Sequence, residues 1–355
     1  MIKLPATNEA VAARAGGGRE DLSPAGGGAA AVAQSAMRQV LSVPVLPITI
    51  IIYALLAVTT PGFLDWANVQ NLLGSMAVLA IAAIGATLVF LVAGIDLSVG
   101  STVALSSVLG AIITRDTGSM LAGLATAILV GVFIGTINGT SVGFLGLPPF
   151  VLTLGVLLTA RAIAYIAAAA AAGGGGTAAS VGELPTGVLE FGQSTLVGIP
   201  TVWWLALALF AGFALFLSRT DTGRGLYLVG ANERAARFNG LRTGLLKCLA
   251  YQIAGGLAGL AGFILMARLG SGNATAGDAL LLQVIAATVI GGTSLFGGLG
   301  GVWRTFVGVF LIVGLTNALG LRGLQSWYQE IIVGVVIVFG SALAIYLQRW
   351  QSRSQ

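Results

Sequence analysis

The chain has 355 residues, of which 57% are hydrophobic and only 8% are charged. Soluble proteins carry roughly 25% charged residues, so this composition excludes an ordinary soluble domain and predicts an all-α membrane protein with many spans. The net charge of +5 gathers beside apolar segments, where membrane topology explains it better than nucleic-acid binding does.

Missing residue types exclude several kinds of chemistry. The sequence has no histidine and one cysteine, so it offers no disulfide, no cysteine–histidine metal site and no histidine-based catalytic pair. Its two lysines, Lys3 and Lys247, precede leucine and cysteine, whereas the phosphate-binding loop of ATPases requires Gly-Lys-Ser or Gly-Lys-Thr. We therefore expect no enzyme activity, metal or cofactor on this chain, and any ATP and Mg²⁺ on a partner ATPase.

Apolar segments recur along most of the chain. Residues 1–38 are rich in glycine, alanine and scattered charge, which is typical of a disordered tail. Residues 39–348 form the predicted transmembrane domain, and residues 349–355 form a short tail. A spanning helix needs ~20 apolar residues. We predict about ten membrane spans, some of them broken, over residues 43–60, 74–93, 98–114, 120–137, 150–170, 197–217, 249–266, 280–290, 302–319 and 329–347.

Basic residues predict which side of the membrane each connection occupies. Arg38 precedes the first span, Arg349 and Arg353 follow the last, and residues 219–247 hold six basic side chains against two acids. Short cytoplasmic loops are enriched in Arg and Lys. An even number of spans with both termini cytoplasmic brings all these clusters to that side. The connection 171–196, which has no basic residue, is then external.

The hydrophilic segment 219–247 also contains a predicted short helix. Asn232 suits the N-cap position, Ala235 is a strong helix former, and Gly240 suits the end of the helix. The i, i+4 spacing of Ala236 and Gly240 predicts a face of small residues, which suits packing against a partner protein or against the chain's own helices. A short helix at the cytoplasmic surface is an element that another protein can push.

A carboxylate interrupts the apolar sequence at AGIDLSVGS, residues 93–101. A charged group at membrane depth is costly and is usually paired or functional. One interpretation makes Asp96 the N-cap of the next helix, accepting hydrogen bonds from backbone N–H groups near Ser98 and Val99. Another makes the break a gate. A second Gly-rich segment, GGTSLFGGLGG at 291–301, is predicted to lie on the same side of the membrane.

Polar side chains within the apolar segments are candidates for a translocation pathway or gate. For each of them, hydrogen bonding between helices is the alternative role. The candidates are Asp96, Ser98, Ser101, Asn138, Thr293, Ser294 and Asn317.

Three motifs together carry a resemblance: VAGIDLSVGS (92–101), GANERAARFNGL (230–241) and VIGGTSLFGGLGG (289–301). They resemble the membrane-spanning permease subunits of bacterial ABC sugar importers of the ribose, xylose, arabinose and galactose type, over about residues 43–347. The resemblance implies import of a pentose or hexose across the bacterial inner membrane by alternating access. It implies three protein partners: a second permease copy, a cytoplasmic ABC ATPase and a periplasmic sugar-binding protein. The family's coupling helix, which meets the ATPase, corresponds to Asn232, Glu233, Ala235, Ala236, Arg237 and Gly240.

Other transport functions stay open at this point. Related permeases move branched-chain amino acids or nucleosides. An ion-coupled secondary transporter would need no ATPase, and Asp96 keeps that alternative open although the spans contain few titratable groups. One stretch departs from the resemblance: six alanines and four glycines at 167–176 replace a more polar sequence. This run is either a flexible external segment or a stretch that does not reflect a native sequence, and it puts sugar contacts from that loop in doubt.

Overall fold

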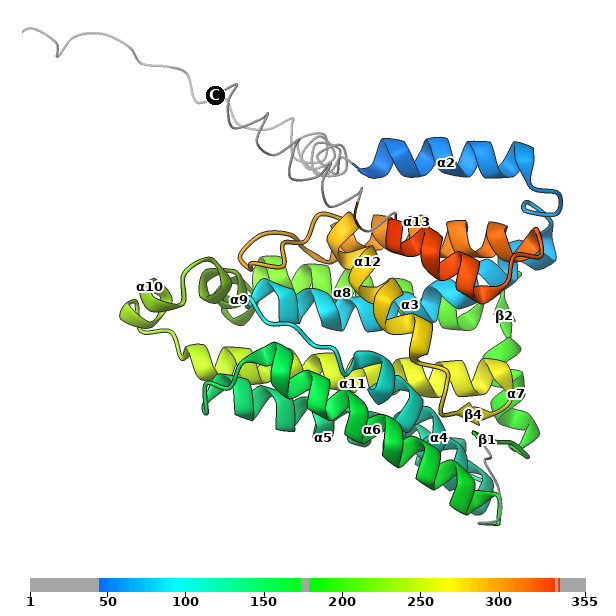
Figure 1. Ribbon diagram of the computed structural model, residues 1–355, viewed down its shortest axis with the longest axis horizontal. Coiled ribbons are helices and arrows are strands. Elements are labelled where there is room, and N and C mark those ends of the chain that lie inside the picture. Colours follow the sequence, from blue (N-terminus) through cyan, green and yellow to red (C-terminus); the bar gives the residue numbers. More distant parts are fainter. Residues whose placement is uncertain (1–44, 174–178, 336–337, 339–355) are drawn as a thin grey trace, which may run out of the picture. The chain divides into compact units, whose positions relative to one another are not determined.

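The computed structural model describes residues 45–173, 179–335 and 338 of the chain (Figure 1), and the predicted tails 1–38 and 349–355 lie outside these residues. The helices are α2 (Val45–Thr59), α3 (Trp66–Leu91), α4 (Val99–Thr117), α5 (Met120–Gly143), α6 (Pro149–Ala171), α7 (Thr186–Gln193), α8 (Thr201–Arg219), α9 (Asp221–Ala231), α10 (Glu233–Phe238), α11 (Thr243–Leu269), α12 (Asp278–Ile290) and α13 (Val302–Leu321). Residues 326–335 are also helical. The strands are β1 (Ser180–Val181), β2 (Thr195–Leu196), β3 (Ile199–Pro200) and β4 (Gly272–Asn273).

Six of the described helices are long and apolar enough to cross a membrane: α3, α5, α6, α8, α11 and α13. The apolar helices α2 and α12 are shorter, and α4 has 19 residues. Nine of the ten predicted spans each overlap one of these helices; of the tenth, 329–347, only residues 329–335 and 338 are described, and they are helical. The all-α, polytopic membrane architecture predicted from composition is confirmed.

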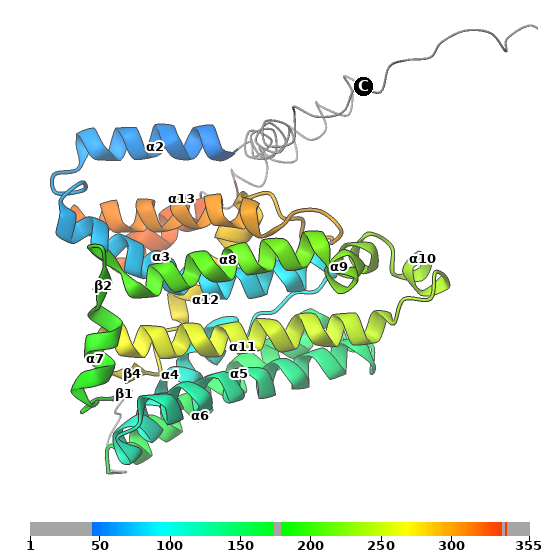
Figure 2. The same cartoon turned by 180° about the vertical axis from the view of Figure 1, so that it is seen from behind.

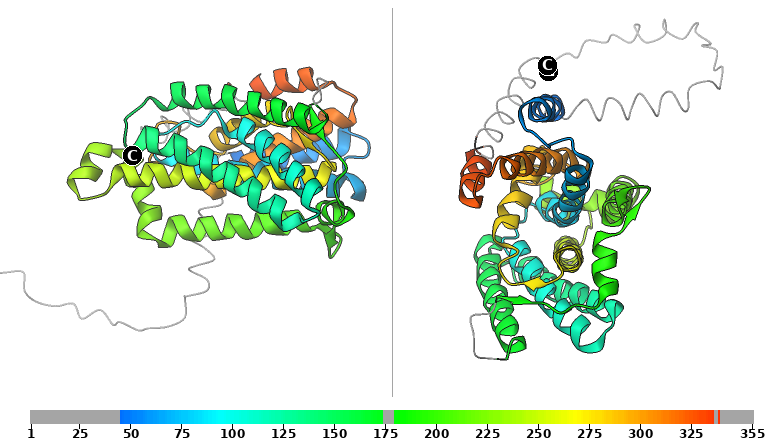
Figure 3. Two further views of the ribbon diagram at one scale, coloured as in Figure 1. Left: turned by 90° about the horizontal axis from the view of Figure 1, so that it is seen from below. Right: turned by 90° about the vertical axis from the view of Figure 1, so that its right-hand side faces the viewer.

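The long helices run back and forth between two ends of the bundle. The elements α9 and α10 lie at one end, and α7, β1 and β4 lie at the other (Figures 1 and 2). We call the end formed by residues 219–247 the basic end and the other the opposite end. Helices α2, α8 and α11 are seen nearly end-on in the right-hand view of Figure 3, whereas α12 runs obliquely to them.

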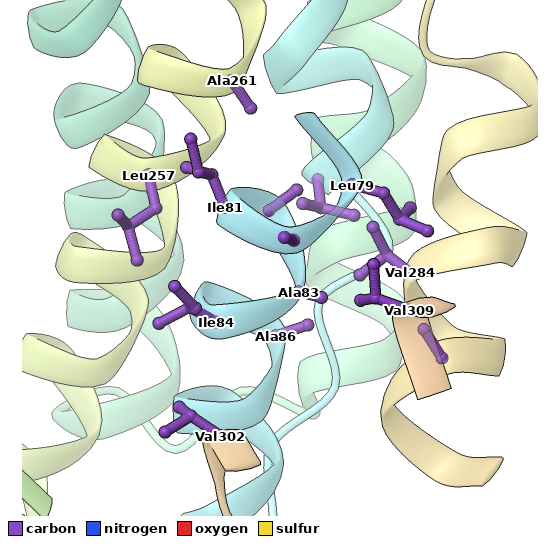
Figure 4. Packing of buried hydrophobic residues seen from close by; sticks show 14 of the residues in the cluster. Leu79, Ile81, Ala83, Ile84, Ala86, Leu257, Ala261, Val284, Val302 and Val309 are labelled. Carbon is purple, nitrogen blue, oxygen red and sulfur yellow. The ribbon is translucent and has the colours of Figure 1, made fainter. Parts of the chain in front are cut away.

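Helix α3 forms the centre of the core. Every residue from Met76 to Ile84 is at most 3% exposed, so this helix is apolar on all sides, as a fully buried helix must be. Its side chains pack against Leu257 and Ala261 of α11, and against helices α12 and α13 (Figure 4). Helix α3 also contacts α8, α9 and β3, so it packs against helices from both halves of the chain.

Glycines bring α5 and α11 into close backbone contact. A side chain at Gly131 would collide with the backbone of Gly255, and one at Gly139 would collide with the backbone of Cys248. In lipid, such small residues allow the packing that holds helices together. The glycine-rich spans therefore form a tightly packed bundle, as the composition predicts.

The opposite end contains short elements that the sequence did not reveal. Strand β1 pairs antiparallel with β4, and β2 pairs with β3. Helix α6 continues through the alanine run to Ala171, with Ala164 and Ala168 fully buried. The interpretation of residues 167–171 as a flexible segment is wrong, because alanine is the strongest helix former and this face packs on the bundle. Residues 174–178 lie outside the described residues.

Candidate functional site

Helix α10 at the basic end begins and ends where the sequence predicts. The Asn232 side chain accepts a hydrogen bond from the Ala235 N–H at 3.0 Å, as an N-cap does. At the other end, the Gly240 N–H donates to the Arg237 carbonyl at 3.0 Å and the Leu241 N–H donates to the Ala236 carbonyl at 3.1 Å. This is the Schellman arrangement, and Gly240 supplies its positive φ of 81°.

An ion pair fixes α10 to the start of α11. The Glu233 carboxylate accepts from the Lys247 ammonium at 2.6 Å and from the Arg237 guanidinium at 3.3 Å. The hydrogen bond from Lys247, with the nearby charges of Lys247 and Arg237, holds the pKa of the Glu233 carboxyl below its usual value. The short helix is therefore held in one position relative to a membrane-spanning helix.

Ala236 and Gly240 do not share a face of α10, and Ala236 packs against the chain's own helices, the second of the two alternatives that the sequence left open. The helix ends at Phe238, so Gly240 lies beyond it, and Ala236 is only 4% exposed because it packs against its own chain. The outward face instead carries Arg234, Ala235 and Phe238. The Phe238 side chain is 91% exposed, an unusual state for an aromatic residue. Sequence reasoning missed Phe238, although a phenylalanine within a basic loop was a usable signal.

The Gly-rich loop 291–301 joins the basic end to the α3–α4 connection. The Gly298 N–H donates to the Leu91 carbonyl at 3.1 Å, and a Cβ at Gly298 would lie 2.8 Å from Ala231 of α9. The Tyr227 hydroxyl of α9 donates to the Gly300 carbonyl at 3.2 Å. The sequence predicts that the segments 93–101 and 291–301 lie on the same side of the membrane. This prediction is confirmed, because the loop 291–301 meets the α3–α4 connection at the basic end.

Asp96 lies in the break between α3 and α4, two residues before Ser98, which is the N-cap of α4. Its carboxylate accepts from the Ser98 N–H at 2.8 Å and from the Ser98 hydroxyl at 2.6 Å. The Asn138 amide of α5 donates to the Ser98 hydroxyl at 2.9 Å, and the Ser101 hydroxyl donates to the Ser98 carbonyl at 2.9 Å. The prediction that Asp96 is the N-cap of α4 is wrong, because the N-cap is Ser98 and Asp96 bonds the N-cap residue from two positions before it. Four of the predicted pathway residues lie together here.

Side chains from α5, α6 and α11 hold this non-helical connection in place. The Leu97 N–H donates to the Thr153 hydroxyl of α6 at 3.1 Å, and the Tyr251 hydroxyl of α11 donates to the Ile95 carbonyl at 3.1 Å. Asn138 and Thr153 lie about 6–8 Å along their helices from the ends nearest the basic end. The side-chain amide oxygen of Asn138 is buried and accepts no hydrogen bond from any described residue. Irregular backbone at this depth is therefore satisfied by side chains, as lipid requires.

The other predicted pathway residues lie elsewhere. Thr293 belongs to a buried chain of hydroxyls, with Thr305 at 3.4 Å from it and Thr87 at 2.7 Å from Thr305. Ser294 closes a turn within the Gly-rich loop by accepting from the Phe296 N–H. Asn317 forms a reciprocal amide pair with an asparagine at the start of α3, at 2.9 and 3.0 Å. The predicted residues therefore do not form one continuous pathway.

A cavity of about 330 Å³ lies toward the opposite end of the bundle, between α3, α11, α12, α13 and the 326–335 helix. Of the predicted pathway residues, only Asn317 lines it. The polar side chains that sequence reasoning missed are Ser75, Arg268, Gln283, Thr316 and Gln329. Each stands alone in an apolar segment, and only the three-dimensional arrangement brings them together.

Comparison with known proteins agrees with this architecture. A family model described as "Branched-chain amino acid transport system / permease component" matches residues 68–340, which is more than half of the chain. The chain belongs to this permease family. The ribose import permease protein RbsC of Escherichia coli K12 is 36% identical over 296 residues, covering 81% of this chain and 89% of its own length.

Other permeases show similar likeness. RbsC of Bacillus subtilis 168 is 36% identical over 310 residues, covering 85% of this chain and 91% of that protein. The autoinducer 2 import system permease protein LsrC of Salmonella paratyphi B is 34% identical over 299 residues, covering 81% of this chain and 84% of that protein. No solved structure matches the chain at a significant level.

Proposed function

We propose that this permease is the membrane-spanning subunit of an ATP-driven importer that moves a pentose or hexose across the bacterial inner membrane. The observation that carries the proposal is α10: a helix capped at both ends, tied to α11 by Glu233 and Lys247, and presenting an exposed Phe238. A rigid helix with an exposed aromatic anchor suits docking into a partner protein. The relatives named as ribose import permeases support the choice of solute.

The proposed mechanism begins on a partner ATPase, which would hold ATP and Mg²⁺. Closure of the ATPase displaces α10 and with it α9. Because Ala231 and Tyr227 of α9 contact the Gly-rich loop, and because that loop contacts Leu91, the displacement reaches the α3–α4 connection. Rearrangement of this connection, in which Asp96 bonds Ser98, then opens or closes the side of the bundle nearest the ATPase.

The proposed assembly places partners at both ends. A second copy of this permease completes the membrane core, and the ATPase docks at the basic end, which is cytoplasmic by the distribution of basic residues. A periplasmic sugar-binding protein delivers solute at the opposite end. Selectivity then rests mainly with the binding protein, so the permease needs only weak affinity for the sugar.

The alternative function, import of branched-chain amino acids, appears in the description of the matching family, but the relatives named as ribose import permeases do not favour it. Uptake into proteoliposomes that contain the permease, its ATPase and its binding protein separates the two. The proposal predicts that ATP drives accumulation of ribose or another monosaccharide and not of leucine. Leucine accumulation, or sugar accumulation driven by a proton gradient without the ATPase, contradicts it.

A further inference from the structure

The cavity near the opposite end has a polar interior that the packing of the bundle does not use. Arg268 is already occupied, because its guanidinium donates to the Asn71 side chain at 3.2 Å, to the Asn71 carbonyl at 3.3 Å and to the Ser75 hydroxyl at 3.4 Å. It also lies flat against Gly74, where any side chain would collide with it. This cation therefore shapes the wall of the cavity and has few donors left to offer a ligand.

Neutral amide and hydroxyl groups remain for a ligand. Gln283 of α12 lines the cavity and makes no hydrogen bond to any described residue. The Gln329 amide nitrogen donates to the Leu324 carbonyl at 2.9 Å, which leaves its amide oxygen as an acceptor. The Thr316 hydroxyl donates to its own helix at 3.0 Å and keeps its capacity to accept.

The remaining walls are apolar. They come from Val78, Leu79, Leu265, Leu280 and Val313. A small-molecule site commonly combines such walls with a few polar groups that fix orientation, in a volume of roughly 300–1,000 Å³. A sugar has hydroxyls that both donate and accept and C–H faces that pack on apolar side chains. A zwitterionic amino acid could set its carboxylate against Arg268, but it would leave its ammonium group facing that cation, amides and aliphatic groups, which is costly.

We propose that this cavity is a low-affinity binding site for one neutral monosaccharide, with Gln283, Thr316 and Gln329 as its hydrogen-bonding side chains. The proposal rests on the proposed function, and it adds the residues of the permease that contact the solute.

The position of Gln283 links this site to the basic end. Helix α12 starts at Asp278, which forms an ion pair with Arg161 of α6, and the preceding Gly277 touches Gly100 in the first turn of α4. The same helix ends at Ile290, where the Gly-rich loop 291–301 begins. The short helix α12 therefore carries a side chain that contacts the solute. It is also attached to the α3–α4 connection and to the Gly-rich loop, which meet at the basic end. Displacement of these breaks would change the cavity.

Protection of a cysteine in the cavity tests the proposal. The buried Cys248 is replaced by serine, and Ala279, which lines the cavity, is replaced by cysteine. The assembled transporter in proteoliposomes is treated from the binding-protein side with a membrane-impermeant maleimide. We expect millimolar ribose to slow labelling of Ala279→Cys severalfold and leucine to leave it unchanged. Thr117→Cys, which is exposed at the end of α4, is the control that ribose should not protect.

A substitution in the same background identifies the contact. Gln283→Leu should abolish protection by ribose while binding-protein-stimulated ATP hydrolysis is retained. Gln252→Leu removes a glutamine amide that donates to the Thr136 hydroxyl at 3.1 Å between α11 and α5, away from the cavity, and should keep the protection. Protection that survives Gln283→Leu overturns the assignment of that contact.

The possible failures can be told apart. If ribose does not protect Ala279→Cys although the same proteoliposomes accumulate ribose, the cavity is not the solute site and the proposed function stands. If leucine protects and is accumulated while ribose does neither, both the sugar site and the proposed function are overturned. Because the labelling of Ala279→Cys leaves Gln283 unchanged, these outcomes do not depend on the folding of the glutamine variant.

Discussion

The two ends of the bundle are stabilised in different ways. At the basic end, α10 is fixed by an N-cap, a Schellman motif and the charged contact between Glu233 and Lys247 at 2.6 Å. Toward the opposite end, two glutamines that line the cavity are held loosely: Gln329 makes one neutral hydrogen bond, to the Leu324 carbonyl, and Gln283 makes none to any described residue. A firmly held helix transmits force, whereas loosely held polar groups can exchange protein partners for a solute. The difference matches an importer that is driven from one end and loaded from the other.

The largest effect is expected from the exposed aromatic residue of α10. Phe238→Ala should weaken ATPase binding by about 2 kcal/mol, roughly thirtyfold in Kd, because an exposed aromatic of this kind contributes most when a partner buries it. Phe144→Ala is the control, since Phe144 is 62% exposed just after α5 and lies outside α10. Affinity of the purified permease for the ATPase, measured in nanodiscs, checks this. Equal losses of ATPase affinity in both variants would contradict the assignment of α10 as the docking element.

A second substitution tests the contact between the basic end and the Gly-rich loop. Gly298→Ala adds a Cβ 2.8 Å from Ala231 at a φ of 72°, so the loop must separate from α9. Uptake should fall severalfold while ATPase binding is retained. Gly323→Ala has a similar φ of 75° but nothing within 4 Å, so it should show only the backbone cost of about 1–2 kcal/mol and keep its transport rate. Equal transport rates in the two variants would show that the contact between Gly298 and Ala231 does not couple α9 to the Gly-rich loop.

Loss of the hydrogen bonds between Asp96 and Ser98 should have an intermediate effect. Asp96→Asn keeps an acceptor for the Ser98 N–H, whereas Asp96→Ala leaves it without one and should cost about 1 kcal/mol of stability. Ser119→Ala removes the N-cap of α5, which accepts from the Ala122 N–H at 3.3 Å, and is a comparable loss outside the break. Thermal unfolding and uptake are measured together. If Asp96→Asn folds normally but fails to transport, the charge itself serves gating; a harmless Asp96→Ala excludes both roles.

The smallest effect concerns the charge on Glu233. Its pKa in the folded protein is lowered, chiefly by the hydrogen bond from Lys247. The stabilisation is therefore fully present above the ordinary glutamate pKa, about 4.3, and is lost as the pH falls through the lower folded value. Because its side chain is 39% exposed, solvent limits the contribution to less than about 1 kcal/mol. Glu233→Gln should flatten the acid side of the stability profile, and Asp221→Asn, at a fully exposed carboxylate, should not.

The sequence was sufficient wherever a feature depends on neighbouring residues. The spans follow from runs of apolar residues, and both ends of α10 follow from Asn232 and Gly240. The hydrogen bond from the Ser98 N–H to Asp96 likewise joins residues two positions apart, although the N-cap itself is Ser98. These features are local, so their chemistry can be recognised in a short window of sequence.

Features that depend on distant residues could not be predicted in this way. Ala236 turned out to face its own chain because α9 and α11 fold back beside it. The cavity combines side chains separated by more than two hundred positions, such as Ser75 and Gln329. The partner of Arg161, Asp278, was equally hidden. No periodicity or spacing along one segment encodes such contacts.

Cross-linking from α10 tests the central claim most directly. In a Cys248→Ser background, a short photoactivatable cross-linker is attached to Ala235→Cys on the outward face of α10, and the whole transporter is irradiated with and without ATP. The account predicts a product with the ATPase subunit whose yield changes with ATP, and no such product from Ala236→Cys, whose site is buried against the permease. Cross-links from Ala235→Cys only to the permease's own helices would contradict it.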